Sequence, residues 1–299
     1  MKMKRKQSRL YSLFIIIIIL VSIILYFLNH FEEILYFPSI IPEEWCNDQP
    51  CIQIELFSTV FTLVQPSSTI LVYSLGHVSI GIGLYLLKVS RRQKVIAWWG
   101  IALLLWGLGA IFAGTSYQAF SYEIKCAGRA LCIWTSWWEV MYLIFSVGSV
   151  AAMMMAQANL APEGRYYTIM YMYAFIDLLS YLVVIVIGSI FPIHFLITFE
   201  LMVLFLAPNI VIFILFNWRR WRRLKQPFDK YLLLIWVFLI IIMGAYFLCY
   251  MSGLTEILWT QGIWFSENDV LHIGLILWML YIGVIINKFR KNILNIIAQ

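Results

Sequence analysis

Long apolar stretches alternate with short polar segments along most of the chain. A helix needs about 20 apolar residues to cross the hydrocarbon of a membrane, and eight stretches come close to that length. The eight predicted spanning helices are Leu10–Leu28, Ser68–Leu87, Val95–Ala113, Leu131–Gln157, Tyr167–Phe191, Ile193–Phe216, Tyr231–Tyr250 and Val270–Ile286. The fifth and sixth are separated only around Pro192, so we expect them to form a tight helical hairpin.

This pattern predicts an all-α integral membrane protein in which an N-terminal signal-anchor helix precedes a seven-helix transmembrane bundle. Residues 1–30 form the basic N-terminus and the anchor, and residues 31–66 an extracytoplasmic loop. Residues 67–288 form the membrane core, and residues 289–299 a cytoplasmic tail. The first span has a basic start and an isoleucine-rich core, but no small-x-small cleavage pattern follows it. We therefore expect an uncleaved anchor.

Composition agrees with a membrane environment. The 299 residues are 63% hydrophobic and 12% charged, whereas soluble proteins are about half apolar and a quarter charged. The sequence has no Gly-x-Ser-x-Gly elbow and no phosphate-binding glycine loop. We expect the partner to be membrane lipid, and we expect neither a nucleic acid nor a soluble cofactor. The protein is expected in the cell membrane or an equivalent endomembrane. The sequence gives no indication of the oligomeric state.

Basic residues are distributed very unevenly between the two ends of the predicted spans. Lysine and arginine accumulate in cytoplasmic loops, and 19 of the 21 fall on one side. They lie in the N-terminus, in residues 88–94, at Arg165, in "NWRRWRRLKQPFDK" and from Lys288 onward. Only Lys125 and Arg129 fall on the opposite side. With an even number of spans, both termini are predicted to be cytoplasmic.

Four of the five cysteines fall in two predicted outer loops, Cys46 with Cys51 and Cys126 with Cys132. An oxidising compartment and a short separation favour two disulfides, and four free thiols are the alternative. Cys249 lies within a span, where we expect it to serve packing.

Few ionisable side chains occur within the spans, where a charge is costly. Given the predicted orientation, several lie at overlapping depths in the outer half of the bundle. They are His77, Glu139, Glu200, Asp269 and His272, with Asp177 nearer mid-depth.

Each of these residues also has a purely structural explanation. His77 and Asp177 can bond to neighbouring helices, and Glu139 can lie at the level of the lipid headgroups. Asp269 begins a helix and suits a cap, which the helix dipole favours. The cap does not account for His272, one turn deeper.

Two histidines and several carboxylates at one depth form a ligand set suited to zinc. Asp269 and His272 are three residues apart and share a helix face, so with His77 they are the predicted metal ligands. We expect His77 and His272 to approach each other. Beside them we expect at least one of Glu139, Asp269, Glu200 or Gln118.

Two short segments carry a family resemblance. The segment "GTSYQAF" (residues 114–120) looks like a Ser-x-x-x-His-type segment in which Ser116 is in place, and it offers Gln118 instead of an imidazole. In "FSENDVLHIG" (residues 265–274), Asp269 and His272 follow a last-helix motif whose first histidine is replaced by Glu267 or Asn268. Across about the last seven spans, the chain resembles the superfamily of alkaline ceramidases, progestin and adiponectin receptors and hemolysin-III-like proteins.

The predicted function is that of a metal-dependent amide or ester hydrolase that acts on lipid from an outward-facing intramembrane site. Zinc would activate water and polarise a carbonyl, with Asp269 or Glu139 as the base. The resemblance implies Ser116 as a third catalytic residue. The alternative is a non-catalytic receptor-like or structural membrane protein, whose polar residues only join helices. Bound zinc would favour the hydrolase.

Overall fold

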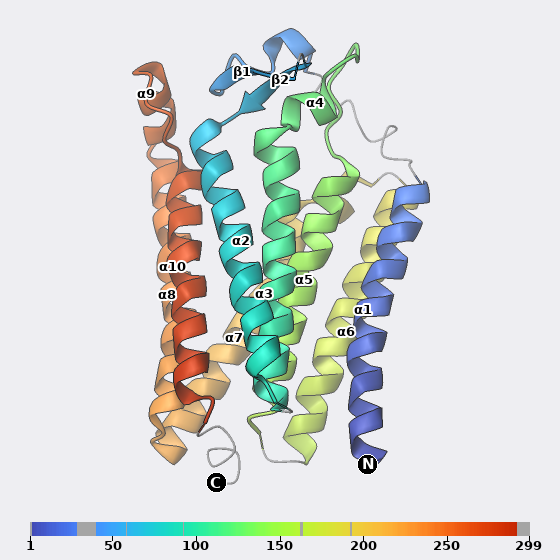
Figure 1. Ribbon diagram of the computed structural model, residues 1–299, viewed down its shortest axis with the longest axis vertical. Helices are drawn as coiled ribbons and strands as arrows, with labels where there is room; N and C mark the ends of the chain where they lie inside the picture. Colours follow the sequence, from blue (N-terminus) through green and yellow to red (C-terminus); the bar gives the residue numbers. More distant parts are fainter. Residues whose placement is uncertain are drawn as a thin grey trace.

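Helices form most of the structure, as expected where lipid offers the backbone no hydrogen-bond partner outside its own helix. The structure is a computed structural model that describes residues 2–28, 40–57, 59–91, 93–161, 164–191 and 193–291 (Figure 1). The long helices are α1 (Lys2–Leu28), α2 (Pro66–Val89), α3 (Lys94–Ala113), α5 (Trp137–Ala158), α6 (Arg165–Ile190), α7 (Phe199–Leu224), α8 (Pro227–Met251) and α10 (Glu267–Phe289).

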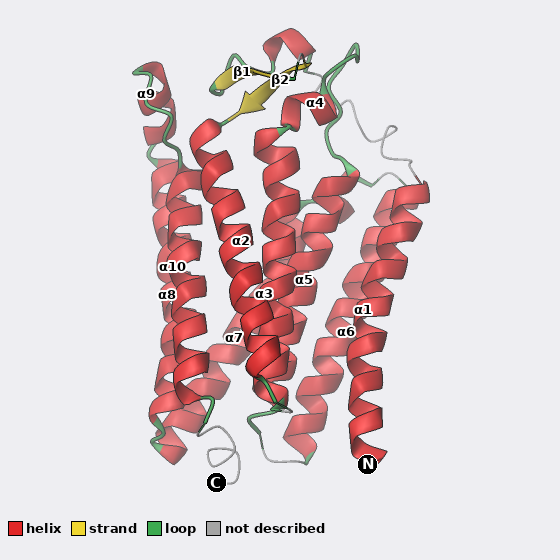
Figure 2. Ribbon diagram, in the orientation of Figure 1, coloured by secondary structure: helices red, strands yellow, loops and turns green. Residues whose placement is uncertain are grey.

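Most short elements gather at one end of the bundle, which we call the hairpin end (Figure 2). It carries the antiparallel hairpin of β1 and β2, which pairs Cys51 with Val64 and Leu56 with Thr59. The short elements are the 3-10 helices Pro42–Glu44 and His194–Ile197, β1 (Cys51–Leu56), β2 (Thr59–Val64), the π-helix Gly114–Ala119, α4 (Ser121–Lys125) and α9 (Leu254–Thr260). The hairpin was not predicted, because it lies in a segment interpreted only as a loop.

Seven helices are long and apolar enough to cross a membrane: α2, α3 with its π-helical extension, α5, α6, α7, α8 and α10. This confirms a polytopic helical membrane protein. The predicted anchor, α1, packs against α5 and α6 (Figure 1). The indole N–H of Trp137 on α5 donates a hydrogen bond to the Ser22 carbonyl of α1 at 3.2 Å. A structural contact therefore joins α1 to the seven-helix part.

Two predicted span boundaries were wrong at their N-terminal ends. The fourth spanning helix begins at Trp137, not Leu131, because the preceding residues belong to a loop closed by the Cys126–Cys132 disulfide. The sixth begins at Phe199, not Ile193, because Thr198 caps it by accepting a hydrogen bond from Leu201 N at 3.3 Å. The predicted topology also included some residues that lie outside the described ones: segment 29–39, Arg92, Pro192 and residues 292–299.

Glycines bring α2 and α3 unusually close together. A Cβ atom on Gly83 of α2 would lie 2.9 Å from the Gly100 carbonyl oxygen of α3. A Cβ atom on Gly107 would lie 2.7 Å from the Gly76 oxygen. Such separations are shorter than real Cβ contacts, so only glycine permits this approach. The two backbones are in direct contact at two levels.

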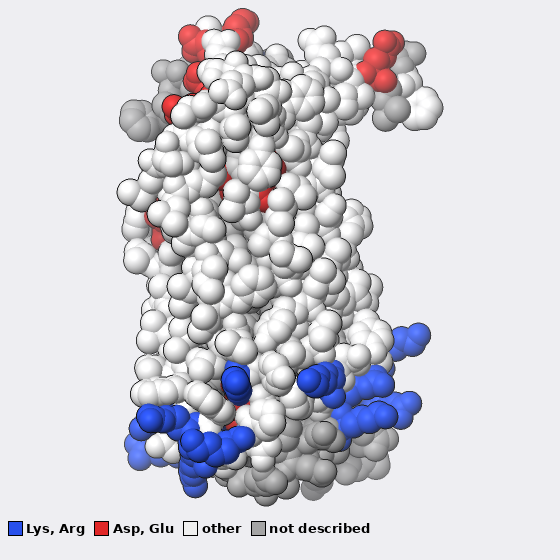
Figure 3. Space-filling view, turned by 90° about the vertical axis from the view of Figure 1, so that its left-hand side faces the viewer, with Lys and Arg blue, Asp and Glu red and all other residues white. Residues whose placement is uncertain are grey.

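Charge divides the molecule along its long axis (Figure 3). Lysine and arginine gather at the end opposite the hairpin, which we call the basic end, and most visible acidic residues lie toward the hairpin end. The start of α1 and the end of α10 both lie at the basic end (Figure 1). This is the arrangement that the positive-inside rule associates with a cytoplasmic face.

We expect the basic end to be cytoplasmic in cells. In a Cys249→Ser background, a cysteine at exposed Thr260 of α9 should react with a membrane-impermeant maleimide in intact cells. A cysteine at exposed Arg223 of α7 should react only after permeabilisation. The opposite labelling pattern would reverse the assignment of the two faces.

Candidate functional site

Asp269 joins the N-terminal ends of α10 and α2. Its carboxylate accepts a hydrogen bond from Ser266 N at 2.7 Å and, with Ser266, forms a capping box. It also accepts hydrogen bonds from Ser67 Oγ at 3.0 Å and Ser68 Oγ at 2.7 Å, at the start of α2. Asp269 is completely buried. The cap proposed for this residue is present, and it extends to a second helix.

The two predicted histidine ligands have different environments. His77 is exposed, and its Nδ1 lies 2.7 Å from the Tyr73 carbonyl oxygen on the same helix. His272 is buried, and its Nδ1 has no hydrogen-bond partner among the described groups. Within the described residues, no three His, Cys, Asp or Glu side chains are grouped so that they could hold a metal ion. The zinc site stays a prediction.

Two other polar residues singled out in the sequence bond within the helical framework. Ser116 lies buried on the π-helix, and its Oγ donates to the Phe112 carbonyl oxygen one turn earlier, at 3.4 Å. Asp177 on α6 accepts a hydrogen bond from Asn209 Nδ2 on α7 at 3.0 Å. The contact of Asp177 agrees with its structural interpretation as a bond between helices.

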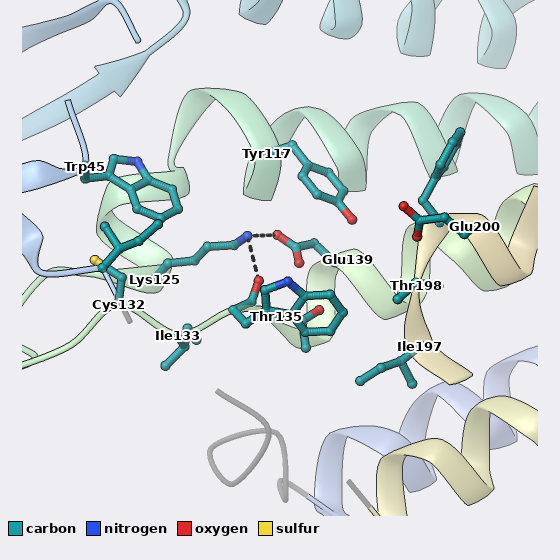
Figure 4. A pocket seen from close by; sticks show the side chains of 13 residues that line it. Trp45, Tyr117, Lys125, Cys132, Ile133, Thr135, Glu139, Ile197, Thr198 and Glu200 are labelled. Atoms are coloured by element: carbon teal, nitrogen blue, oxygen red, sulfur yellow. Dashed lines mark hydrogen bonds and ion pairs between the residues drawn. The ribbon is translucent and has the colours of Figure 1, made fainter. Parts of the chain in front are cut away.

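Glu139 lies in a cavity at the hairpin end, where it forms an ion pair with Lys125 (Figure 4). Both residues are buried, with 2% and 6% of their surfaces exposed. The Lys125 ammonium also donates to the Trp134 carbonyl oxygen at 3.1 Å. It lies 5.2 Å from the ring centre of Tyr117 and 5.7 Å from that of Trp45. Carboxylate, carbonyl and two aromatic rings thus surround one ammonium group.

The cavity measures about 370 Å³ and lies between the hairpin ends of α3, α5 and α7. Its residues are Ile40, Trp45, Tyr117, Lys125, Cys132, Ile133, Trp134, Thr135, Glu139, Ile197, Thr198, Phe199 and Glu200. Lys125 and Glu139 belong to its buried part, whereas Phe199 and Glu200 are exposed at its rim. This volume falls within the range of about 300–1,000 Å³ that is typical of small-molecule sites.

The chain folds locally so that this cavity has a fixed wall. Cys126 directly follows Lys125 and is disulfide-bonded to Cys132, which lines the cavity. Two backbone bonds hold the same loop: Ile133 N donates to the Lys125 carbonyl at 2.9 Å, and Cys132 N to the Ile40 carbonyl at 2.8 Å. The second predicted disulfide, Cys46–Cys51, is also present and lies next to Trp45. Both predicted cysteine pairings are therefore confirmed.

Helix ends place the two acidic residues of the cavity. Glu139 lies in the first turn of α5 and Glu200 in the first turn of α7. The N-terminal end of a helix carries a partial positive charge, which stabilises a carboxylate there. A π-helix, a form that is frequent at functional sites, carries Tyr117 between them (Figure 4).

Lys125 is a residue of the cavity that the sequence pattern did not single out as a site residue. In the sequence it stands out only as one of the two basic residues on the outer side of the predicted topology. Its position on the outer side, against the general charge bias, was the signal in the sequence that could have identified it. A cation that is buried there needs an acidic partner. Glu139 was predicted as a catalytic base, but the structure pairs it with this cation.

A second buried ion pair lies at the basic end. Arg220 Nε of α7 contacts Asp229 Oδ1 of α8 at 2.8 Å, and Asp229 is completely buried. Arg220 also donates to the Leu160 carbonyl oxygen after α5. This pair joins α7 and α8, and Arg220 connects them to the turn after α5.

Comparison with protein-family models, with curated proteins and with solved structures gives no match. The chemistry of the cavity therefore follows from its own residues. It offers a buried ion pair, a second carboxylate at the rim, and aromatic and aliphatic walls. Such a site can bind a molecule that has both an apolar and a polar part.

Proposed function

We propose that the protein is a receptor-like, multi-pass membrane protein that binds an amphipathic, lipid-like ligand in the cavity at its hairpin end. The observation that supports this most is a cavity of about 370 Å³ that extends from an exposed rim to a buried ion pair. Apolar and aromatic side chains with a few convergent polar groups are characteristic of ligand sites. The predicted orientation makes this cavity outward-facing.

A non-catalytic site agrees best with the bonding of the predicted catalytic residues. Asp269 accepts hydrogen bonds at two helix ends, and Glu139 forms an ion pair with Lys125. Ser116 donates a hydrogen bond within its own helix. The lipid hydrolase implied by the resemblance stays a prediction. Its test is release of a fatty acid or an amine from a bound lipid, which a binding protein would not produce.

Filling the cavity should remove the ligand. We expect protein purified in a mild neutral detergent to retain a small set of amphipathic molecules, detected by native mass spectrometry. Ile197 is buried and lines the cavity, and Ile197→Trp should lower the retained ligand at least about tenfold, because the indole occupies its volume.

Leu204→Trp is the matched control, because it adds the same side chain to an exposed position on α7. It should retain the ligand at the wild-type level. Ile133→Trp fills the same cavity from the segment that precedes α5. The same loss of ligand in this variant would show that the effect does not come from a folding defect specific to Ile197→Trp. Equal retention by the wild type and both filled variants, at unchanged thermal stability, would contradict a ligand site here.

A further inference from the structure

We infer that the cavity takes a ligand with one cationic ammonium group on an apolar chain, an inference that rests on the proposed function. The charges that line the cavity lead to this assignment. Three lining residues carry a formal charge: Lys125, Glu139 and Glu200. Lys125 and Glu139 neutralise each other, which leaves the lining with one net negative charge.

That remaining charge belongs to Glu200. Its carboxylate lies at the exposed rim and forms no ion pair within the part of the chain that the structure describes. The first turn of α7 stabilises the negative charge but supplies no counter-ion. A ligand that brings one positive charge balances the cavity, whereas an anionic ligand meets the unpaired Glu200 carboxylate.

The protein's own ammonium group shows which partners the cavity offers a cation. At one end, Lys125 Nζ lies beside the Glu139 carboxylate and over the rings of Trp45 and Tyr117. Tyr117 then faces Glu200 on its other side (Figure 4). The rim therefore has the same pair of groups as the buried end, a carboxylate (Glu200) beside an aromatic ring (Tyr117). Aromatic faces and a carboxylate are the usual groups that recognise ammonium, including quaternary ammonium.

The surface next to the rim accounts for the apolar part of the ligand. Phe195, Phe199 and Val203 are exposed apolar side chains on both sides of Glu200. An alkyl chain that leaves the rim along α7 stays in contact with Phe199 and Val203 and, in a membrane, with lipid. An ammonium-bearing lipid and a free amine share the same headgroup chemistry, so the source must be distinguished by chain length.

Binding of matched detergents tests the assignment. Dodecyltrimethylammonium, dodecyl sulfate and tetramethylammonium are titrated, below micelle-forming concentrations, into full-length protein in neutral maltoside. A change in the intensity or wavelength of tryptophan fluorescence reports occupancy, since Trp45 and Trp134 line the cavity. We expect saturable binding of dodecyltrimethylammonium, absent in Ile197→Trp and weakened about tenfold or more in Glu200→Gln.

Glu256→Gln is the charge-matched control, because Glu256 is exposed in the first turn of α9 and does not line the cavity. It should bind the detergent as the wild type does. Tetramethylammonium binding as tightly as the long-chain cation would support the ammonium group, overturn the apolar chain, and identify a small free amine as the source. Much weaker binding would identify a lipid.

Two outcomes separate failure of this inference from failure of the proposed function. Cavity-dependent binding of dodecyl sulfate, without binding of the cation, would overturn the ammonium assignment and leave a ligand site in place. Loss of dodecyltrimethylammonium binding in Ile197→Trp, with no effect of Glu200→Gln, would likewise overturn the role of Glu200. Binding of all probes that is equal in the wild type and in both cavity-filled variants would contradict the site itself.

Discussion

Lys125→Met is expected to lower the free energy of unfolding by about 3–5 kcal/mol, the usual cost of removing one partner of a buried ion pair. The substitution keeps most of the apolar length of the side chain but leaves the Glu139 carboxylate uncompensated. Glu139 is only 2% exposed, so solvent cannot replace the lost ammonium. Denaturation in mixed micelles of neutral detergent and dodecyl sulfate measures the change.

The double variant Lys125→Met/Glu139→Leu identifies the cause. Replacing both charges by apolar side chains removes the penalty of an unpaired ion, so its stability should return to the wild-type level or exceed it. Lys230→Met removes an exposed lysine at the basic end and should change stability by no more than about 0.5 kcal/mol. A single variant as stable as the wild type would mean that Lys125 and Glu139 are not a buried pair.

Asp269→Ala is expected to lower the free energy of unfolding by about 2–4 kcal/mol, the combined cost of a lost helix cap and lost charged hydrogen bonds. The carboxylate bonds to Ser266 of α10 and to Ser67 and Ser68 of α2, all from a completely buried position. Its removal leaves the Ser266 N–H without its acceptor and removes the hydrogen bonds that Ser67 and Ser68 donate to α10. The same denaturation assay measures the loss.

Glu256→Ala is the control for Asp269→Ala, because it removes an exposed carboxylate from the first turn of a neighbouring helix. It should change stability by no more than about 0.5 kcal/mol. Adding zinc then distinguishes the two roles of Asp269, as a helix cap and as a metal ligand. A wild-type stability that rises with zinc, and does so only while Asp269 is present, would argue for the predicted metal site by ligand linkage.

The membrane-spanning helices were predictable because hydropathy alone determines them. The lipid environment imposes both the length of each span and the helical form of its backbone, so an apolar run of about 20 residues is sufficient evidence. The hairpin of β1 and β2 lies outside that constraint. Its strands are short, and local pairing and a disulfide at Cys51 hold them, neither of which the hydropathy pattern records.

For the candidate site, only the depth of each side chain along the bundle axis was predictable from the sequence. Position along a span correctly placed Glu139 and Glu200 near one end of the bundle, and the structure brings both to one cavity. Position along a span does not determine which face of the helix a side chain occupies. His77 is therefore exposed while His272 is buried, although both were predicted at similar depths. Lys125 was missed because it lies at the end of the short helix α4, outside the predicted spans, and only the folded chain brings it to α5.

The contact between α2 and α3 also limits how the bundle can move. Because Gly83 and Gly107 bring the two backbones into contact at two levels, we expect these helices to shift as one body. The π-helix at the end of α3 carries Tyr117, so one wall of the cavity is expected to move with α2 and α3. The opposite wall begins α7, which contains Pro208 and lacks a backbone hydrogen bond at that point. Opening or closing of the cavity is therefore expected to be a hinge motion of α7 about Pro208, with α2 and α3 as the fixed frame.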